Sequence, residues 1–207
     1  MAAITDALGG EHLFAEVPVG GVADWVPLYE VMIQERLSAW ALPVDRLDDL
    51  PVALGLFGRR ARIGVHGVRF PHEVSAAFDA GAAFVTSPVC SPELVAAAAG
   101  RPFVAGGLTP QEVGGAVAQG ATAAQVIPAD VMGMSYSRAL MAMLPDVPIV
   151  ATGRLERFQA EMWLQAGAVA VGLSQTILLP EDDGAVNPND PDEVRRRCQT
   201  VANLATG

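Results

Sequence analysis

Residues 109–122 read TPQEVGGAVAQGAT, which combines a start signal and a stop signal for one helix. Thr109 and Glu112 have the spacing of a capping box, and Pro110 takes the first helical position, where a missing N–H costs nothing. Gly120 suits the left-handed residue that closes a helix. The stretch therefore predicts a helix followed directly by a strand.

The same sequence pattern recurs in residues 71–85 (PHEVSAAFDAGAAFV). Its second part, the helix end followed by a strand, recurs in residues 165–171 (QAGAVAV). Short apolar runs without strict alternation are typical of parallel strands that are covered on both faces. They predict eight strands, at residues 13–17, 39–42, 62–64, 84–86, 103–105, 123–127, 149–151 and 169–172.

Eight strands with helices between them predict an α/β fold, a compact (β/α)₈ TIM barrel formed as one domain by residues 1–207. A doubly wound open sheet is the rival, and the absence of a G-x-G-x-x-G motif after any strand weakens it. Residues 180–191 are predicted to be a loop, followed by a last helix over about 192–205.

The composition limits both the partners and the chemistry. The chain has 207 residues, 51% of them hydrophobic, and a net charge of −10, which argues against disorder, nucleic acid and anionic membranes. All 13 basic residues are arginine, so no lysine amine is present to form a Schiff base.

The two cysteines, Cys90 and Cys198, are too few for a disulfide framework, and the first residues do not resemble a signal peptide. The apolar runs are too short to span a bilayer. We therefore expect a cytoplasmic protein. No histidine or carboxylate cluster has the spacing of metal ligands, so neither a metal nor another cofactor is expected.

In such a barrel the chemistry lies at the carboxyl ends of the strands. The catalytic candidates there include His66, which lies between glycines that would expose it at the mouth, and Asp45. Glu16 interrupts the first apolar strand, so it either points into the mouth or pairs with an arginine. His66 could equally be a hydrogen-bonded structural histidine.

Two segments could bind an anion. Residues 152–154, Thr152-Gly153-Arg154, combine an approachable backbone with a guanidinium, and residues 172–174, Gly172-Leu173-Ser174, open a predicted short helix. Arg46, after the second strand, is a further candidate for substrate binding. The glycines could instead simply make tight turns. We expect a small anionic metabolite as the ligand.

Several segments, taken in order, resemble the 2-keto-3-deoxy-6-phosphogluconate (KDPG) and 4-hydroxy-2-oxoglutarate (KHG) aldolases over roughly residues 14–180. They are residues 64–68 (GVHGV), 80–88 (AGAAFVTSP), 105–110 (AGGLTP), 127–129 (IPA), 151–153 (ATG) and 172–174 (GLS). The resemblance implies a barrel, usually a homotrimer, that cleaves a 2-oxo acid to pyruvate and an aldehyde.

The chain departs from this family at the reacting residues. Gln125 stands where the family has its Schiff-base lysine, and Ala41 stands where it has a catalytic glutamate. Gly67, beside His66, replaces a threonine. Arg154 replaces the second glycine of the phosphate-binding turn, whereas Gly153 and Ser174 match phosphate-binding positions. The resemblance therefore implies that the imine chemistry is lost.

Three hypotheses follow. The chain could be an enzyme of different mechanism, in which Gln125 donates a hydrogen bond to a substrate carbonyl and His66, Glu16 or Asp45 moves protons. It could be a catalytically inactive homologue that binds a metabolite or a protein partner. It could also be a structural subunit, in which case apolar side chains would seal the mouth.

Overall fold

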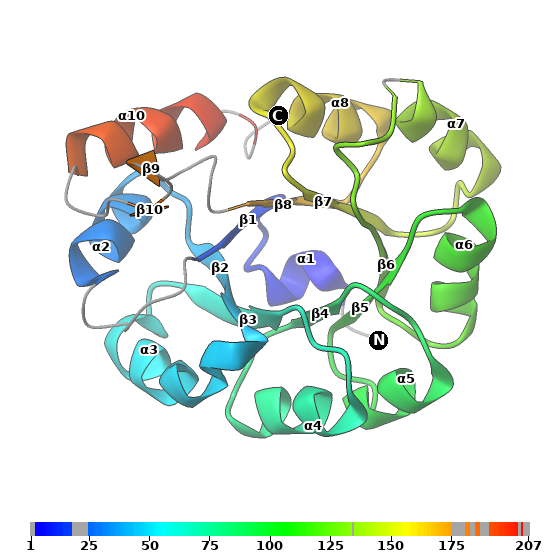
Figure 1. Cartoon of the computed structure of the whole chain (residues 1–207), viewed down its shortest axis with the longest axis horizontal. Coiled ribbons are helices and arrows are strands. Elements are labelled where there is room, and N and C mark those ends of the chain that lie inside the picture. The colour runs from blue at the N-terminus through cyan, green and yellow to red at the C-terminus, as the bar shows by residue number, and fades with distance from the viewer. Residues whose placement is uncertain are drawn as a thin grey trace.

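Eight parallel strands close into a barrel in which each strand pairs with the next and β8 pairs with β1 (Figure 1). The computed structural model describes residues 3–17, 25–133, 135–174, 181–182, 185–186, 191–202 and 204. The barrel strands are β1 (Leu13–Glu16), β2 (Ala39–Pro43), β3 (Arg62–His66), β4 (Val85–Ser87), β5 (Phe103–Gly107), β6 (Ala123–Val126), β7 (Ile149–Gly153) and β8 (Ala170–Leu173). The predicted (β/α)₈ barrel is confirmed, and the predicted strands differ from these by at most two residues at either end.

The helices form a ring outside the strands (Figure 1). They are α2 (Val26–Gln34), α3 (Leu50–Phe57), preceded by the 3₁₀ helix η2 (Val44–Asp49), α4 (Pro71–Asp79), α5 (Pro92–Ala98), α6 (Pro110–Ala118), α7 (Tyr136–Met143), α8 (Arg157–Ala166) and the C-terminal α10 (Pro191–Ala202). The helix α1 (Ile4–Ala7) precedes β1 and does not belong to this outer ring.

A short antiparallel pair, β9 (Glu181–Asp182) and β10 (Ala185–Val186), lies within the stretch predicted to be a loop. The loop prediction is wrong at these four residues, because two-residue strands are too short to leave a pattern in the sequence. The other residues from 180 to 190 lie outside the described residues.

The predicted capping box and the predicted helix-closing glycines are present in the structure. The Thr109 hydroxyl accepts a hydrogen bond from the Glu112 N–H at 3.3 Å, and the Glu112 carboxylate accepts one from the Thr109 N–H at 2.8 Å. Gly120 and Gly167 follow α6 and α8 with φ of +105° and +110°. Since only glycine adopts these angles without strain, each helix ends there and the chain turns into the next strand.

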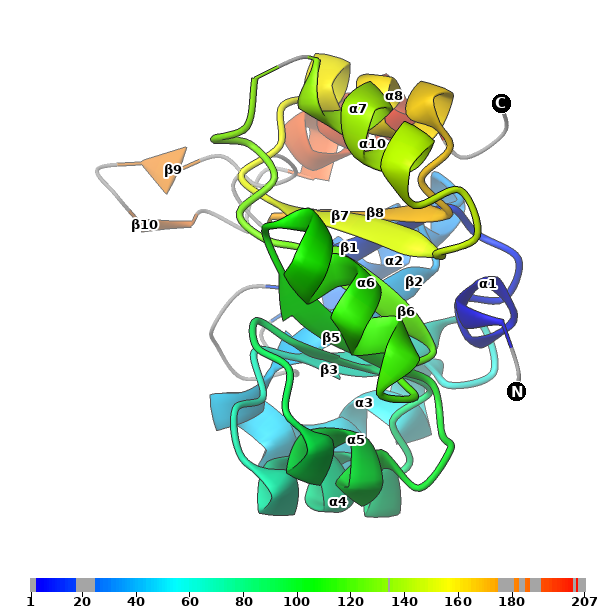
Figure 2. The ribbon, with the colours of Figure 1, turned by 90° about the vertical axis from the view of Figure 1, so that its right-hand side faces the viewer.

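The amino-terminal half of the lumen is filled by apolar side chains. Phe14 and Phe84 meet edge to face with their ring centroids 5.3 Å apart. Ile4 and Leu8, from α1 and its C-terminal end, belong to the same buried cluster. In the side view α1 lies at the end of the barrel opposite β9 and β10 (Figure 2), so this helix plugs the amino end.

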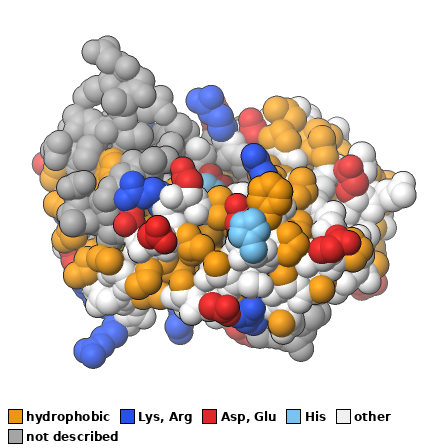
Figure 3. All heavy atoms as spheres, turned by 60° about the horizontal axis from the view of Figure 1, so that its bottom comes forward, with side chains coloured by type: hydrophobic (Ala, Val, Ile, Leu, Met, Phe, Trp, Pro, Cys, Tyr) orange, Lys and Arg blue, Asp and Glu red, His pale blue; other side chains and the backbone are white. Residues whose placement is uncertain are grey.

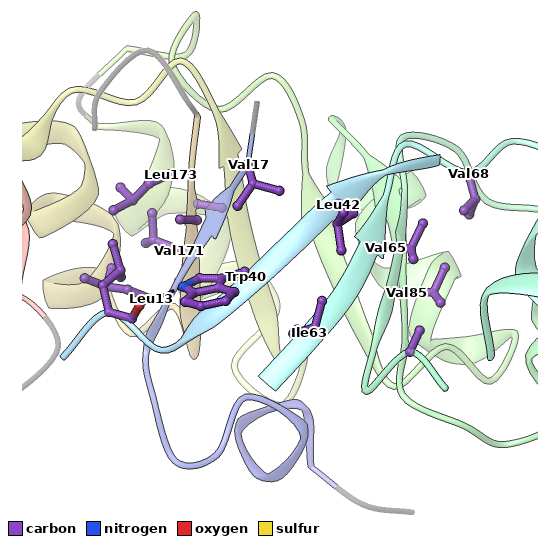
Figure 4. Packing of buried hydrophobic residues seen from close by; sticks show 14 of the residues in the cluster. Leu13, Val17, Trp40, Leu42, Ile63, Val65, Val68, Val85, Val171 and Leu173 are labelled. Atoms are coloured by element: carbon purple, nitrogen blue, oxygen red, sulfur yellow. Dashed lines mark hydrogen bonds between the residues drawn. The ribbon is translucent and has the colours of Figure 1, made fainter. Parts of the chain in front are cut away.

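A second core fills the space between the barrel and its helices. Leu13, Trp40 and Leu173 point outward from β1, β2 and β8 (Figure 4). Trp40 stacks on Tyr29 of α2 with the ring centroids 4.7 Å apart. Apolar side chains also remain on the surface among charged ones (Figure 3). Val52 and Leu56 of α3 are among the exposed apolar residues.

Candidate functional site

The carboxyl-terminal half of the lumen is polar. Side chains alternate along a strand, so Glu16 faces the lumen on the same side of β1 as the buried Phe14. On four other strands, the residue two positions after a lumen residue of the apolar half also faces the lumen at this end of the barrel. These residues are His66, Thr86, Gln125 and Thr152. Of the catalytic candidates, the barrel therefore brings Glu16, His66 and Gln125 into one lumen.

Glu16 and His66 are neighbours, with the Glu16 carboxylate 3.9 Å from Nδ1 of His66. Their side chains are 24% and 22% exposed, so the histidine is less exposed than its flanking glycines suggested. Within the described residues, no arginine nitrogen lies within 4.0 Å of the Glu16 carboxylate. Of the two alternatives for Glu16, the structure therefore favours the one in which it points into the mouth.

Burial shifts the protonation of both groups toward the neutral form. It raises the pKa of Glu16 to about 7. It lowers the pKa of His66 to about 4, and the negative charge of Asp45 opposes that shift in part. At neutral pH the Glu16 carboxyl is therefore divided between its two forms, while the imidazole is neutral. A carboxyl group that is partly ionised at neutral pH therefore lies beside a neutral imidazole.

Within the part of the chain that the structure describes, three buried polar atoms at this end of the lumen have no hydrogen-bond partner, namely His66 Nε2, Gln125 Oε1 and Thr152 Oγ1. The Gln125 amide nitrogen donates to the Ser87 carbonyl at 3.3 Å, so the atom it leaves unpartnered is its acceptor. We expected a donor here. Buried polar atoms are seldom left unpaired, because their desolvation is costly. A polar ligand is the natural partner for all three.

Asp45 and Arg46 lie in η2, beside the barrel mouth rather than in the lumen. The Arg46 guanidinium binds the Asp49 carboxylate through Nε at 2.8 Å and through Nη2. A ligand anion would have to compete with Asp49 for Arg46. Asp45 acts on the lumen through its charge, which favours the protonated form of His66.

The turn after β7 is held by a residue that the sequence had not linked to it. Asp130, in the loop after β6, accepts a hydrogen bond through its carboxylate from the Arg154 N–H at 3.1 Å. Gly153 has a φ of +138°, and a Cβ atom there would lie 2.3 Å from Asp130 Oδ1. One N–H of the predicted anion-binding turn is therefore already used. The Arg154 side chain is exposed and forms no ion pair with any described residue.

The second predicted anion segment contributes to packing. A Cβ atom on Gly172 would lie 2.4 Å from Phe14 Cζ and 2.7 Å from Thr152 Cγ2, so only glycine leaves room for these side chains. Ser174 is buried at the end of β8. The short helix predicted to begin there falls in residues 175–180, outside the described residues.

The described part of the chain has neither a cluster of metal ligands nor a membrane-spanning helix. No group of three or more His, Cys, Asp or Glu side chains is arranged to hold a metal ion there. In the same residues no helix has the length and the apolar character needed to cross a membrane.

Known aldolases resemble this chain. It is 28% identical over 131 residues to the 2-dehydro-3-deoxy-6-phosphogalactonate aldolase of Escherichia coli K12, covering 62% of this chain and 64%, less than two thirds, of that relative's length. It is 27% identical over 155 residues to the probable 2-dehydro-3-deoxy-6-phosphogalactonate aldolase of Rhizobium meliloti 1021, covering 72% and 73% of the two chains.

Solved structures agree in fold. A 4-hydroxy-2-oxoglutarate/2-dehydro-3-deoxyphosphogluconate aldolase from TTHB1 superposes with a TM-score of 0.79 at 27% identity, covering 99% of this chain and all of that chain. The KDPG aldolase of Zymomonas mobilis ATCC 29191 gives a TM-score of 0.82 at 16% identity, over 98% of each chain. The sequence profile of the family described as "KDPG and KHG aldolase" matches residues 60–196, more than half of the chain. The chain belongs to the KDPG and KHG aldolase family.

Proposed function

We propose that this chain is a divergent aldolase-family barrel that binds a small oxo acid, with or without a phosphate group, at the carboxyl end of its lumen. The three unpartnered atoms carry this proposal. His66 Nε2 and Thr152 Oγ1 can donate to a carbonyl or carboxylate oxygen, and Gln125 Oε1 can accept from a hydroxyl group. A hydroxylated oxo acid offers all three complements in one small molecule.

The proposed chemistry does not use an imine. A Schiff base needs a primary amine, and the sequence contains no lysine. Gln125, at the position where the resemblance puts the lysine, is 2% exposed, and its amide nitrogen donates a hydrogen bond to the Ser87 carbonyl. An amide nitrogen is not nucleophilic, so Gln125 binds or orients a ligand and does not attack it.

A structural subunit is the competing reading, and it calls for a lumen sealed by apolar side chains. The amino-terminal half of the lumen fits that description, but the carboxyl-terminal half keeps Glu16, His66, Gln125 and Thr152. Keeping polar groups without partners costs stability. Their presence therefore supports a ligand site, for catalysis or for binding alone.

Calorimetric titration with 4-hydroxy-2-oxo acids, with and without a terminal phosphate, tests the proposal. Wild type is expected to bind at least one of them. We propose that the exposed Arg154 guanidinium contacts the terminal carboxylate or phosphate of the ligand, so Arg154→Ala is expected to weaken binding by about 10- to 100-fold. Arg138→Ala, which removes another exposed arginine without an ion pair among the described residues, is the matched control and should change nothing.

Borohydride treatment with pyruvate tests the mechanism, and it is expected to trap no adduct except at the α-amino group of Met1. A wild-type protein that binds none of the oxo acids would overturn the proposed ligand. Binding that is unchanged in Arg154→Ala would overturn the contact proposed for Arg154. A stoichiometric borohydride adduct at any other residue would overturn the imine-free mechanism.

A further inference from the structure

Glu16 lies beside the position where the resemblance calls for a glutamate. In the pairing of β1 with β2, Glu16 is the register partner of Ala41. Ala41 belongs to the lumen cluster that contains Phe14, and Glu16 faces the lumen two residues after Phe14. The carboxylate absent from β2 is thus present one strand away, at the same height in the barrel.

Resting on the function proposed above, we propose that Glu16 and His66 form a proton-transfer pair that exchanges hydrogen on the carbon next to the carbonyl group of the bound oxo acid. Glu16 is the base and His66 is the hydrogen-bond donor to the carbonyl oxygen. The ligand class is a carbon acid, a 2-oxo acid with at least one hydrogen on its third carbon.

The protonation states fit these roles. A carboxylate whose pKa lies near 7 is a stronger base than an ordinary one, and a good part of it is ionised at neutral pH. A neutral imidazole keeps one N–H to donate, and His66 is neutral because burial depresses its pKa. A glutamate base with a neutral histidine donor is an established arrangement for proton abstraction next to a carbonyl group.

The two ring nitrogens of His66 have different surroundings. Nδ1 faces the Glu16 carboxylate at 3.9 Å, and Nε2 is the buried nitrogen without a partner. The 3.9 Å separation is too long for a hydrogen bond, so Nδ1 is not held as the protonated nitrogen, and the proposed role places the proton on Nε2, which donates it in a hydrogen bond to the ligand. A donor at the carbonyl oxygen favours the enolate, because the negative charge develops on that atom.

The step is balanced within the site. The carbon–hydrogen bond breaks and its proton moves to the Glu16 carboxylate. The electron pair forms the carbon–carbon double bond of the enolate, whose oxygen is held by the His66 N–H. The Glu16 proton exchanges with water, and the reverse step returns a solvent hydrogen to carbon. No oxidant, metal or amine is required.

Deuterium exchange followed by proton NMR tests the inference, with 2-oxobutyrate in deuterated buffer as the probe. Wild type is expected to exchange the methylene hydrogens faster than buffer alone. Glu16→Gln removes the base and is expected to lower the protein-dependent rate by about 100-fold or more. His66→Gln should lower it as well. Glu161→Gln, a change on the outer helix α8, is the control and should keep the wild-type rate.

Calorimetry on the same samples separates the two proposals. Retained 2-oxobutyrate binding in Glu16→Gln with lost exchange supports the pair. Wild-type binding without exchange overturns the inference and leaves the proposed ligand site standing. Exchange that persists in Glu16→Gln also overturns it. Absence of binding by wild type to any oxo acid overturns the proposed function, and the inference falls with it. Circular dichroism of each variant shows that the barrel is intact.

Discussion

The two halves of the lumen are built from the same strands but have opposite character. At the amino end, Phe14 and Phe84 pack edge to face under the plug formed by α1. Two residues further along β1, Glu16 faces a lumen with unpartnered polar atoms. β6 and β7 repeat the change, from Ala123 to Gln125 and from Val150 to Thr152.

This contrast separates the groups that stabilise the fold from those that are available for chemistry. The amino half makes close apolar contacts and leaves no polar side chain unpartnered there among the described residues. Among the described residues, the carboxyl half holds two partly buried titratable groups with shifted pKa values and three polar atoms without partners. Variants of the two halves should therefore differ in sign as well as in size.

Phe14→Ala should give the largest effect. Phe14 is 2% exposed and fills the space that glycine leaves at position 172. Its removal leaves a cavity in a close-packed lumen, so the free energy of unfolding should fall by about 3–5 kcal/mol. Chemical denaturation measures it. Phe158→Ala on α8, where the ring is 50% exposed, is the control and should cost far less. A loss below about 1 kcal/mol for Phe14→Ala would mean that the amino half is not the stabilising core.

Glu16→Gln should stabilise the protein, and only at neutral to alkaline pH. Burial raises the pKa of Glu16 from 4.5 to about 7, so the folded state prefers the protonated carboxyl. The stability that this preference contributes is complete below pH 4.5 and is lost as the pH rises through about 7. Glutamine stays neutral throughout. The variant should therefore exceed wild type by about 1–3 kcal/mol at pH 8 and match it near pH 4.

Denaturation of both proteins at several pH values checks this expectation, with Glu161→Gln as the control. His66 shifts in the opposite direction. Its neutral form contributes stability above pH 6.5 that is lost as the pH falls through about 4, and this loss should be common to wild type and variant. A gain for Glu16→Gln that does not depend on pH would show that the carboxylate is not desolvated.

The sequence predicts the barrel more fully than the site. Capping boxes, helix-closing glycines and apolar runs are local signals, and they placed the strands to within two residues. The placement of Asp130 on the turn at Arg154 joins loops from two strands, 24 residues apart, and no local pattern encodes such a contact. Similarly, Glu16 reaches the lumen because it follows Phe14 by two residues on β1, whereas Asp45 and Arg46 lie in η2, beyond the end of β2. All three residues were candidates by type, and the sequence alone does not fix where β2 ends.

Thr152→Val should have the smallest effect on stability and the clearest effect on ligand binding. Thr152 is 1% exposed and its hydroxyl has no partner, while its methyl group lies against Gly172. Valine keeps that methyl group and replaces the desolvated hydroxyl with carbon, so the free energy of unfolding should stay the same or rise by about 0.5–1 kcal/mol. Thr122→Val is the matched control, because the Thr122 hydroxyl accepts from the Phe103 N–H at 3.1 Å and donates to the Arg101 carbonyl at 3.4 Å. That variant leaves a buried N–H unpaired, and its free energy of unfolding should fall by about 1–2 kcal/mol.

If Thr152→Val loses as much stability as Thr122→Val, its hydroxyl has a partner inside the folded protein, and the contrast between the two halves of the lumen weakens. If instead Thr152→Val is as stable as wild type but binds the oxo acid less tightly, the hydroxyl is retained at a cost in stability for the sake of the ligand.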